Sequence, residues 1–132
     1  MLKFELPPAP SLNNATINVW GHGRVKSPRY RRWLVRADSH YVLQNLGRIP
    51  KIKVPYACSM WFPKAKGADI DGRAKLILDW MVSRNLTIDD RYCRRLALEI
   101  DESIKDNLVR IEVTPYVESQ LPSEPGAAQR AA

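Results

Sequence analysis

Two aspartates separated by one residue, Asp69 and Asp71, have the residue types and spacing best suited to chemistry in this chain. On an extended segment residues i and i+2 face the same way, so both carboxylates would reach one cation while Ile70 points into the core. Lys75 follows Asp71 by four residues and would share its helix face, and the pair Asp89–Asp90 comes one predicted helix later. Oxygen ligands of this kind suit Mg²⁺ or Mn²⁺. A cation held there would polarise a phosphodiester and activate water, with the lysine stabilising the developing negative charge.

Each of these pieces also has a purely structural interpretation. Two aspartates at the start of a helix can cap it and interact favourably with its dipole. Asp89–Asp90 could form a solvated turn, and Lys75 could pair only with Asp79, four residues on, a contact worth roughly 0.3–0.5 kcal/mol. The acidic motif alone therefore does not separate a metal site from an ordinary helix start.

The charge of the chain points to a partner. Lysine and arginine total 21 against 14 aspartate and glutamate residues, which gives a net charge of +7 over 132 residues. Such an excess favours a polyanion, and phosphate contacts would recognise the shape of a nucleic acid rather than its sequence. Six basic residues lie between positions 24 and 36 with no acidic residue among them. The residues predicted to contact DNA are Arg24, Lys26, Arg29, Arg31, Arg32, Arg36, Lys64 and Lys66.

Periodicity and turn residues predict the elements that must position these side chains. Ser27 and Pro28 are a typical helix start, and Gly47 is expected to end that helix. Two glycines at 21 and 23 predict a turn. The expected extended segments are 2–6, 16–20, 51–62, 93–100 and 108–113, and the expected helices are 29–46 and 71–84. The order strand, helix, strand, helix, strand, strand predicts a single α+β domain with a mixed sheet and two main helices packed on it.

The helix predicted at 71–84 is apolar on more than one side. Leu76 and Trp80 lie away from its main apolar stripe, which indicates a second packing partner such as another subunit. The tryptophans are expected mostly in the core or at an interface. Trp20 is the candidate for stacking on an unpaired base, and His22, two residues later, is expected to be an exposed turn residue or a phosphate contact rather than a catalytic base.

Other features narrow the class of protein. Cys58 and Cys93 are far apart in sequence and show no zinc-ligand spacing, so we expect two buried, reduced thiols in a cytoplasmic protein, with a Cys58–Cys93 disulfide as the less favoured alternative. The chain has neither a signal-peptide pattern nor a run of about 20 apolar residues that could span a membrane. Residues 117–132 are rich in Ser, Pro, Gly, Ala and Gln, which predicts a disordered tail behind a folded domain at 1–116.

The acidic motif resembles the site of RusA-type Holliday junction resolvases. That family has Asp-Leu-Asp-Asn at a strand-to-helix junction, a lysine four residues after the second aspartate, and an Asp-Asp pair after the helix. The run from Asp69 to Lys75 and the later Asp89–Asp90 have the same arrangement, although Gly72 stands where Asn is usual and Ala68 where a basic residue is common. The proline-rich turn at 7–14 is also similar, and the resemblance covers about residues 2–116.

The resemblance implies a RusA-like nuclease domain that uses Mg²⁺. Asp69, Asp71 and Asp90 would be its metal ligands and Lys75 its essential lysine. Family members are homodimers that cut paired strands of branched DNA at four-way junctions, and they are common in phages and prophages, so the expected location is the bacterial cytoplasm.

Two other functions have to be weighed. A non-catalytic DNA-binding protein could use the basic first helix alone, but carboxylates facing a phosphate backbone repel it unless a cation intervenes. A phosphatase or nucleotide hydrolase could use the Asp-x-Asp motif, but the sequence has no glycine-rich phosphate loop, and its charge favours a long polyanion. The acidic residues and the charge together favour a metal-dependent DNA endonuclease.

Overall fold

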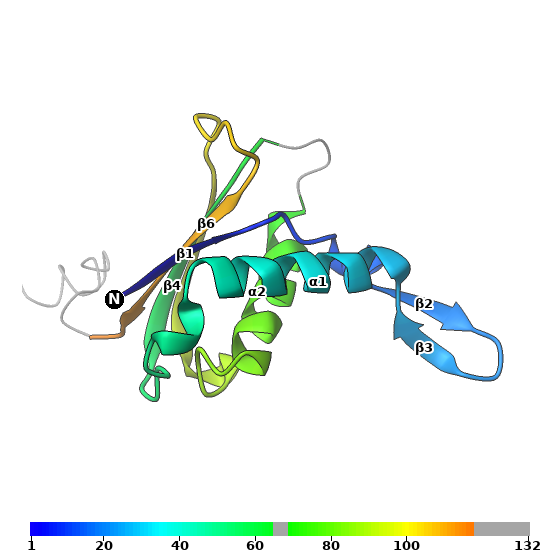
Figure 1. The fold of residues 1–132 in the computed structure, drawn as a ribbon, viewed down its shortest axis with the longest axis horizontal. Coiled ribbons are helices and arrows are strands. Elements are labelled where there is room, and N and C mark those ends of the chain that lie inside the picture. The colour runs from blue at the N-terminus through cyan, green and yellow to red at the C-terminus, as the bar shows by residue number, and fades with distance from the viewer. Residues whose placement is uncertain (65–68, 118–132) are drawn as a thin grey trace, which may run out of the picture.

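The computed structural model describes residues 1–64 and 69–117, which form a four-stranded sheet, a separate two-stranded hairpin and two helices (Figure 1). The strands are β1 (Leu2–Leu6), β2 (Thr16–Val19), β3 (Gly23–Lys26), β4 (Tyr56–Phe62), β5 (Cys93–Ile100) and β6 (Val109–Pro115). The helices are α1 (Pro28–Leu43) and α2 (Ile70–Ser83), and short 3-10 turns occur at η1 (Leu12–Asn14), η2 (Leu46–Arg48) and η3 (Asp90–Tyr92). The predicted α+β domain with a mixed sheet and two main helices is confirmed.

The four-stranded sheet has the order β1-β6-β4-β5 and combines both kinds of pairing. β6 is antiparallel to β1 and to β4, whereas β4 and β5 are parallel. Parallel neighbours need a crossover connection, which α2 supplies between β4 and β5. The register aligns Phe4, Ile111 and Met60 across three strands, and all three are buried. One face of the sheet therefore forms the core.

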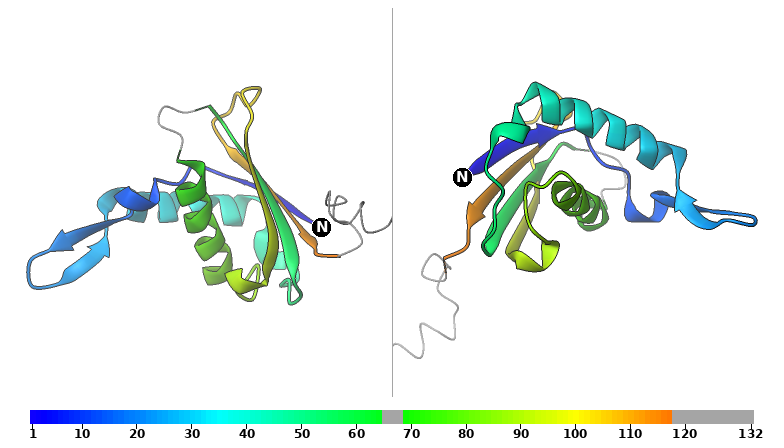
Figure 2. Two further views of the ribbon diagram at one scale, coloured as in Figure 1. Left: turned by 180° about the vertical axis from the view of Figure 1, so that it is seen from behind. Right: turned by 60° about the horizontal axis from the view of Figure 1, so that its bottom comes forward.

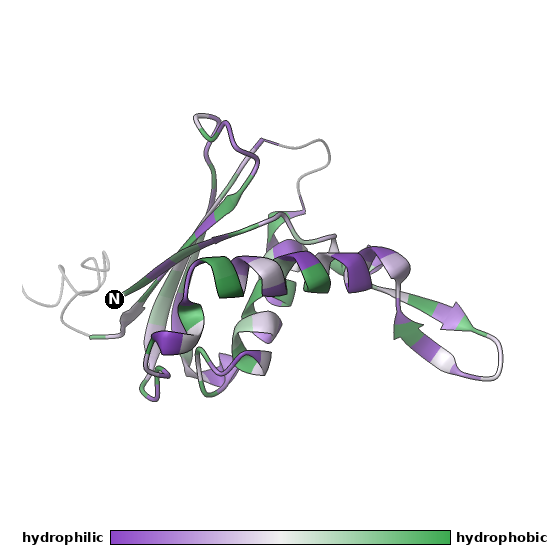
Figure 3. Ribbon diagram, viewed as in Figure 1, coloured by the Kyte–Doolittle hydropathy of each residue, from purple (hydrophilic) through white to green (hydrophobic). Residues whose placement is uncertain are grey.

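The helices cover this face (Figures 1 and 2). Figure 3 shows bands of hydrophilic and hydrophobic residues along α1, as expected for a helix with one buried side. Trp33 and Ala37 provide that buried side. α2 buries more of its surface, and its Trp80 ring lies 6.0 Å from the Phe4 ring and 6.2 Å from the Tyr41 ring, measured between centroids. α2 is thus enclosed by the sheet and by α1.

This arrangement corrects one expectation about α2. Leu76 and Trp80 were predicted to be spare apolar surface for another subunit, but they are only 3% and 1% exposed within the single chain. Trp80 also donates a hydrogen bond from Nε1 to Asp38 Oδ1 at 3.1 Å, and Asp38 lies on α1. The second apolar side of α2 is covered by α1 and β1, so it is not available to a partner.

Two other boundaries differ from the predictions. α1 ends at Leu43 rather than at 46. The next side chain, Gln44, accepts a hydrogen bond from Glu5 N and donates one to Glu5 O, both at 2.8 Å, which ties the end of the helix to β1. Asn45 then adopts a left-handed conformation with φ 55°, so it is Asn45 and not Gly47 that reverses the chain. The strand expected at 51–62 begins only at Tyr56, since the preceding Pro55 has no amide proton to donate.

The segment at 16–20 is half of a hairpin that the sequence did not predict. β2 pairs with β3 in antiparallel register, and this hairpin projects away from the rest of the domain (Figures 1 and 2). The predicted glycine turn is confirmed, with φ 80° at Gly21 and 71° at Gly23. The helix start is also confirmed, because Ser27 Oγ accepts a hydrogen bond from Tyr30 N at 3.1 Å.

The remaining sequence predictions concern the two cysteines, membrane-spanning segments and the residues outside the described ranges. Cys58 is buried, Cys93 is half-buried, and both are free. Burial raises the pKa of the Cys58 thiol to about 12. Within the described part of the chain, no helix combines the length and apolar character needed to cross a membrane. The predicted tail lies outside the described residues from position 118 onward, as does Lys66.

Candidate functional site

The start of α2 brings the first two aspartates together. Asp69 is the N-cap residue and accepts a hydrogen bond from Gly72 N at 3.3 Å, while Asp71 lies in the first helical turn. The interaction between the two side chains raises the pKa of Asp69 and lowers the pKa of Asp71. The pair was predicted on an extended segment, but Asp69 is instead at the helix cap and Asp71 in the first turn, where the two side chains interact. Two carboxylates this close can share a cation.

Gly72 permits this geometry. A Cβ atom at this position would lie 2.5 Å from Asp69 Oδ2 and 3.1 Å from the backbone nitrogen of Leu12. Any larger residue would therefore have to move either the capping carboxylate or η1. Glycine at this position has a local reason, because the missing side chain lets Asp69 fold back over the helix start.

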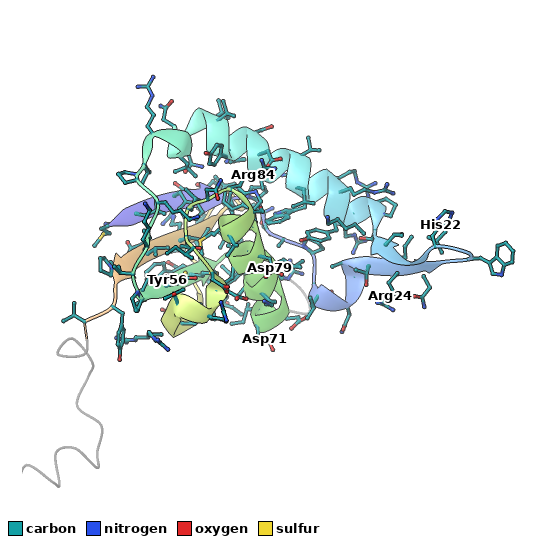
Figure 4. The ribbon with its side chains drawn as sticks, turned by 90° about the horizontal axis from the view of Figure 1, so that it is seen from below. His22, Arg24, Tyr56, Asp71, Asp79 and Arg84 are labelled. Atoms are coloured by element: carbon teal, nitrogen blue, oxygen red, sulfur yellow. The ribbon has the colours of Figure 1, made fainter. Side chains whose placement is uncertain are left out.

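Lys75 links the helix to the second acidic segment. Its Nζ lies 2.9 Å from Asp79 Oδ1 and 2.5 Å from Asp90 Oδ2, and these two contacts raise the pKa of Lys75 above its ordinary value. The contact with Asp79 is the one expected if Lys75 only stabilises its own helix. The contact with Asp90 is not explained in this way, because it joins α2 to η3 across 15 residues of sequence. Figure 4 shows Asp71 near the start of α2 and Asp79 further along it.

The structure distinguishes Asp89 from Asp90. Asp89 caps η3 by accepting hydrogen bonds from Arg91 N at 3.0 Å and Arg91 Nε at 3.1 Å. The backbone hydrogen bond from Arg91 lowers the pKa of Asp89. Asp90 instead points toward Lys75. Asp90 is therefore the member of the pair that faces α2.

The predicted acidic trio is arranged as a pair and a third residue. Among residues 1–64 and 69–117, no three His, Cys, Asp or Glu side chains are close enough to form a metal-binding group. Asp69 and Asp71 lie at the start of α2, and Asp90 is held beside Lys75, one helical turn further along. The oxygen donors of Asp69 and Asp71 fit Mg²⁺, whereas Asp90 is paired through its Oδ2 with Lys75.

Several of the predicted basic residues line one surface depression of about 350 Å³, which we call the basic depression. Its charged lining residues are Arg29, Arg32, Arg36 and Arg73. The three arginines of α1 are spaced at i, i+3 and i+7 and so share a helix face. Arg31 is exposed on α1 but lies outside this depression. The two helices thus place four guanidinium groups together.

Arg73 is a residue that the sequence reasoning missed. Its Nη1 donates a hydrogen bond to Ala9 O at 3.0 Å, and its buried Nε has no hydrogen-bond partner among the described residues. Arg73 follows Asp71 by two residues on α2 and lines the basic depression. The sequence did contain a signal for it. Arg73 lies between Asp71 and Lys75, so its side chain originates from the same helical turn as the candidate site.

The other predicted basic residues lie elsewhere. Arg24 is on β3, where its guanidinium donates to Thr16 Oγ1 at 2.6 Å and to Asn18 Oδ1 at 3.5 Å. Lys26 ends the same strand. Lys64 forms an ion pair with Glu102 at 3.6 Å. The hairpin therefore carries basic residues away from the acidic pair rather than toward it.

Comparison with models of known protein families and with curated proteins finds no match to this chain. Function must therefore be argued from the site itself. Its elements are an acidic pair at a helix start, a lysine bound to a third aspartate one turn later, and four arginines beside them.

Proposed function

We propose that this protein is a divalent-metal-dependent DNA endonuclease that cuts four-way junctions, as the resemblance to RusA-type resolvases implies. The observation that supports the proposal is the Lys75–Asp90 contact, because Lys75 follows Asp71 by four residues and so shares its helix face. A helix cap formed by Asp69 would need neither Lys75 nor Asp90. The same resemblance would place the protein in the cytoplasm of a bacterial cell.

The site residues divide the chemical work. Asp69 and Asp71 would hold Mg²⁺ or Mn²⁺, with Asp90 as a third ligand. The bound cation supplies Lewis acidity, which polarises a phosphodiester and lowers the pKa of water. Lys75 would hold a non-bridging phosphate oxygen and stabilise the charge that develops there. The basic depression would bind phosphates of the same DNA arm, so that the strand passes over the start of α2.

A labelled four-way junction tests this function directly. We expect nicks near the branch point with Mg²⁺ and none with EDTA, and no cleavage of a linear duplex of the same sequences. Binding without cleavage over a range of Mg²⁺ and Mn²⁺ concentrations would favour the alternative, a non-catalytic DNA-binding protein. In that case Lys75, Asp79 and Asp90 would be only a structural ion-pair network.

The basic depression gives a prediction about salt dependence. Arg32→Ala should weaken junction binding and reduce the slope of log affinity against log salt by roughly 0.9, because one phosphate contact is lost. Arg31→Ala is the matched control, since this exposed residue lies on the same helix outside the depression. Binding should be measured by titration between low and moderate salt. Equal effects of the two substitutions would mean that DNA does not follow the depression.

We propose that the protein is a homodimer, because cutting two opposed strands needs two sites. Because α2 is enclosed within the chain, the support for a dimer comes from β5. This strand forms one edge of the sheet, and its Leu96 and Ile100 are 42% and 40% exposed. An unpaired edge can accept a further strand. If two copies of β5 pair antiparallel about Ala97, each Arg95 faces the other copy's Glu99, so the strand is complementary to itself in charge.

A charge exchange tests this dimer. Arg95→Glu and Glu99→Arg should each weaken dimerisation roughly tenfold, because like charges then face each other at two symmetric positions. The double variant Arg95→Glu/Glu99→Arg should restore it. Light scattering and sedimentation at micromolar concentration would measure the mass. A wild-type monomer, or a double variant no better than the single ones, would contradict pairing through β5.

A further inference from the structure

The tip of the β2–β3 hairpin carries the most exposed large apolar side chain of the described residues. Trp20 is 98% exposed, whereas Trp33 and Trp80 are 3% and 1% exposed. Apart from the adjoining residues of the chain, no described atom lies within 4 Å of where a Cβ would stand on Gly21 or on Gly23, so the neighbouring turn is also open. The indole therefore contributes nothing to the core, and its exposure to water is unfavourable unless something covers it.

The hairpin is built to hold this side chain in place. The turn is closed by a hydrogen bond from His22 N to Val19 O at 2.9 Å. Further down, Arg24 crosses from β3 to hydrogen-bond Thr16 on β2. At the base, Ser27 N donates to Ala15 O at 2.8 Å. These contacts limit the freedom of the hairpin, so binding through its tip would cost less conformational entropy than binding through a flexible loop.

The surroundings of the tip favour a nucleic acid. The chain has no acidic residue between positions 6 and 37, and Arg24 and Lys26 are exposed on β3. Figure 4 shows His22 and Arg24 along the same projecting hairpin. A flat aromatic ring among cations suits an unstacked base whose neighbouring phosphates are negative, because every base has a face on which an indole can stack. Membrane insertion would need more apolar surface than one indole offers.

We propose that Trp20 stacks on an unpaired or unstacked nucleobase at the branch point of the DNA, while Arg24 and Lys26 contact the adjoining phosphates. The inference rests on the proposed function, because it takes a DNA branch as the ligand. It adds a binding site that is separate from the acidic residues. The hairpin would thereby distinguish a junction, whose bases can unstack, from an intact duplex, whose bases are already stacked on one another.

The test uses the full-length Asp71→Asn variant without a divalent cation, so that the DNA stays intact. A four-way junction carries 2-aminopurine at the branch point, and a linear duplex carries it at a central position. Trp20→Ala should weaken binding to the junction about 5- to 150-fold and abolish the quenching of 2-aminopurine, with little change for the duplex. Trp20→Phe should retain most of both. Ile17→Ala is the matched control, because this apolar residue is also exposed on the hairpin.

The outcomes separate this inference from the proposed function. If the parent protein binds junction and duplex equally, the choice of ligand is wrong and both fail. If it prefers the junction but Trp20→Ala binds it with unchanged affinity, the inference alone is overturned. An equal loss on junction and duplex would also overturn it, because stacking at a branch would then not be the cause. Two further results for Trp20→Ala would overturn the inference if junction binding stayed unchanged. One is loss of binding to anionic vesicles, and the other is loss of the dimer in light scattering.

Discussion

Replacing Asp71 by Asn should lower Mg²⁺-dependent junction cleavage by roughly 10³-fold while junction binding is kept or strengthened. The substitution removes one of two clustered carboxylates at the start of α2, and with it a charge that repels phosphate. Asn is nearly the same size and can still accept a hydrogen bond, so the helix start should persist. Single-turnover cleavage at saturating Mg²⁺ and a gel-shift titration would measure the two effects separately.

Matched variants locate the rest of the site. Asp69→Asn and Asp90→Asn should resemble Asp71→Asn. Asp79→Asn removes the other carboxylate that contacts Lys75, and Asp89→Asn removes the one that binds Arg91. We expect each of these two to lose less than about tenfold, since neither would be a metal ligand. Near-normal cleavage by Asp71→Asn, or an equally large loss in Asp79→Asn, would contradict the proposed division of roles.

Truncating Trp80 should have the largest effect on stability. We expect Trp80→Ala to lower the free energy of unfolding by about 3–5 kcal/mol, because it leaves a cavity against Phe4 and Tyr41 and removes the hydrogen bond to Asp38. Chemical denaturation followed by circular dichroism would measure it. Trp20→Ala is the control of the same residue type, and its change should stay within about 0.5 kcal/mol. Similar values for the two tryptophans would mean that Trp80 is not buried as described.

The sequence predicted regular elements well where one periodicity extended over several residues. β1 and β5 lie at the predicted positions, and α2 is shifted by a single residue at each end, since apolar alternation or helical spacing is clear in each. β3 was missed because its residues at 23–26 show no apolar alternation, and its pairing with β2 is their main structural role. The end of α1 depended on the distant backbone of Glu5, which local patterns do not reveal.

The candidate site was predictable in its parts but less so in its arrangement. Spacing along a helix was enough to place Lys75 one turn after Asp71, and the structure has it there. The contact between Lys75 and Asp90 depends on how the chain returns from α2 to β5, which spacing does not determine. Trp80 was misjudged for a similar reason, because an apolar helix side can face another helix of the same chain as readily as another subunit.

All the acidic residues of the site, and its lysine, lie between residues 69 and 90, in the single crossover that joins the parallel strands β4 and β5. α2 is the rigid body of that crossover, and the capping turn before it and η3 after it are attached to its two ends. A sliding or tilting of this helix would therefore displace every one of these groups at once. Damage to the packing beneath α2 would disrupt the site as a unit. Amide hydrogen exchange along α2 would report how often the helix opens.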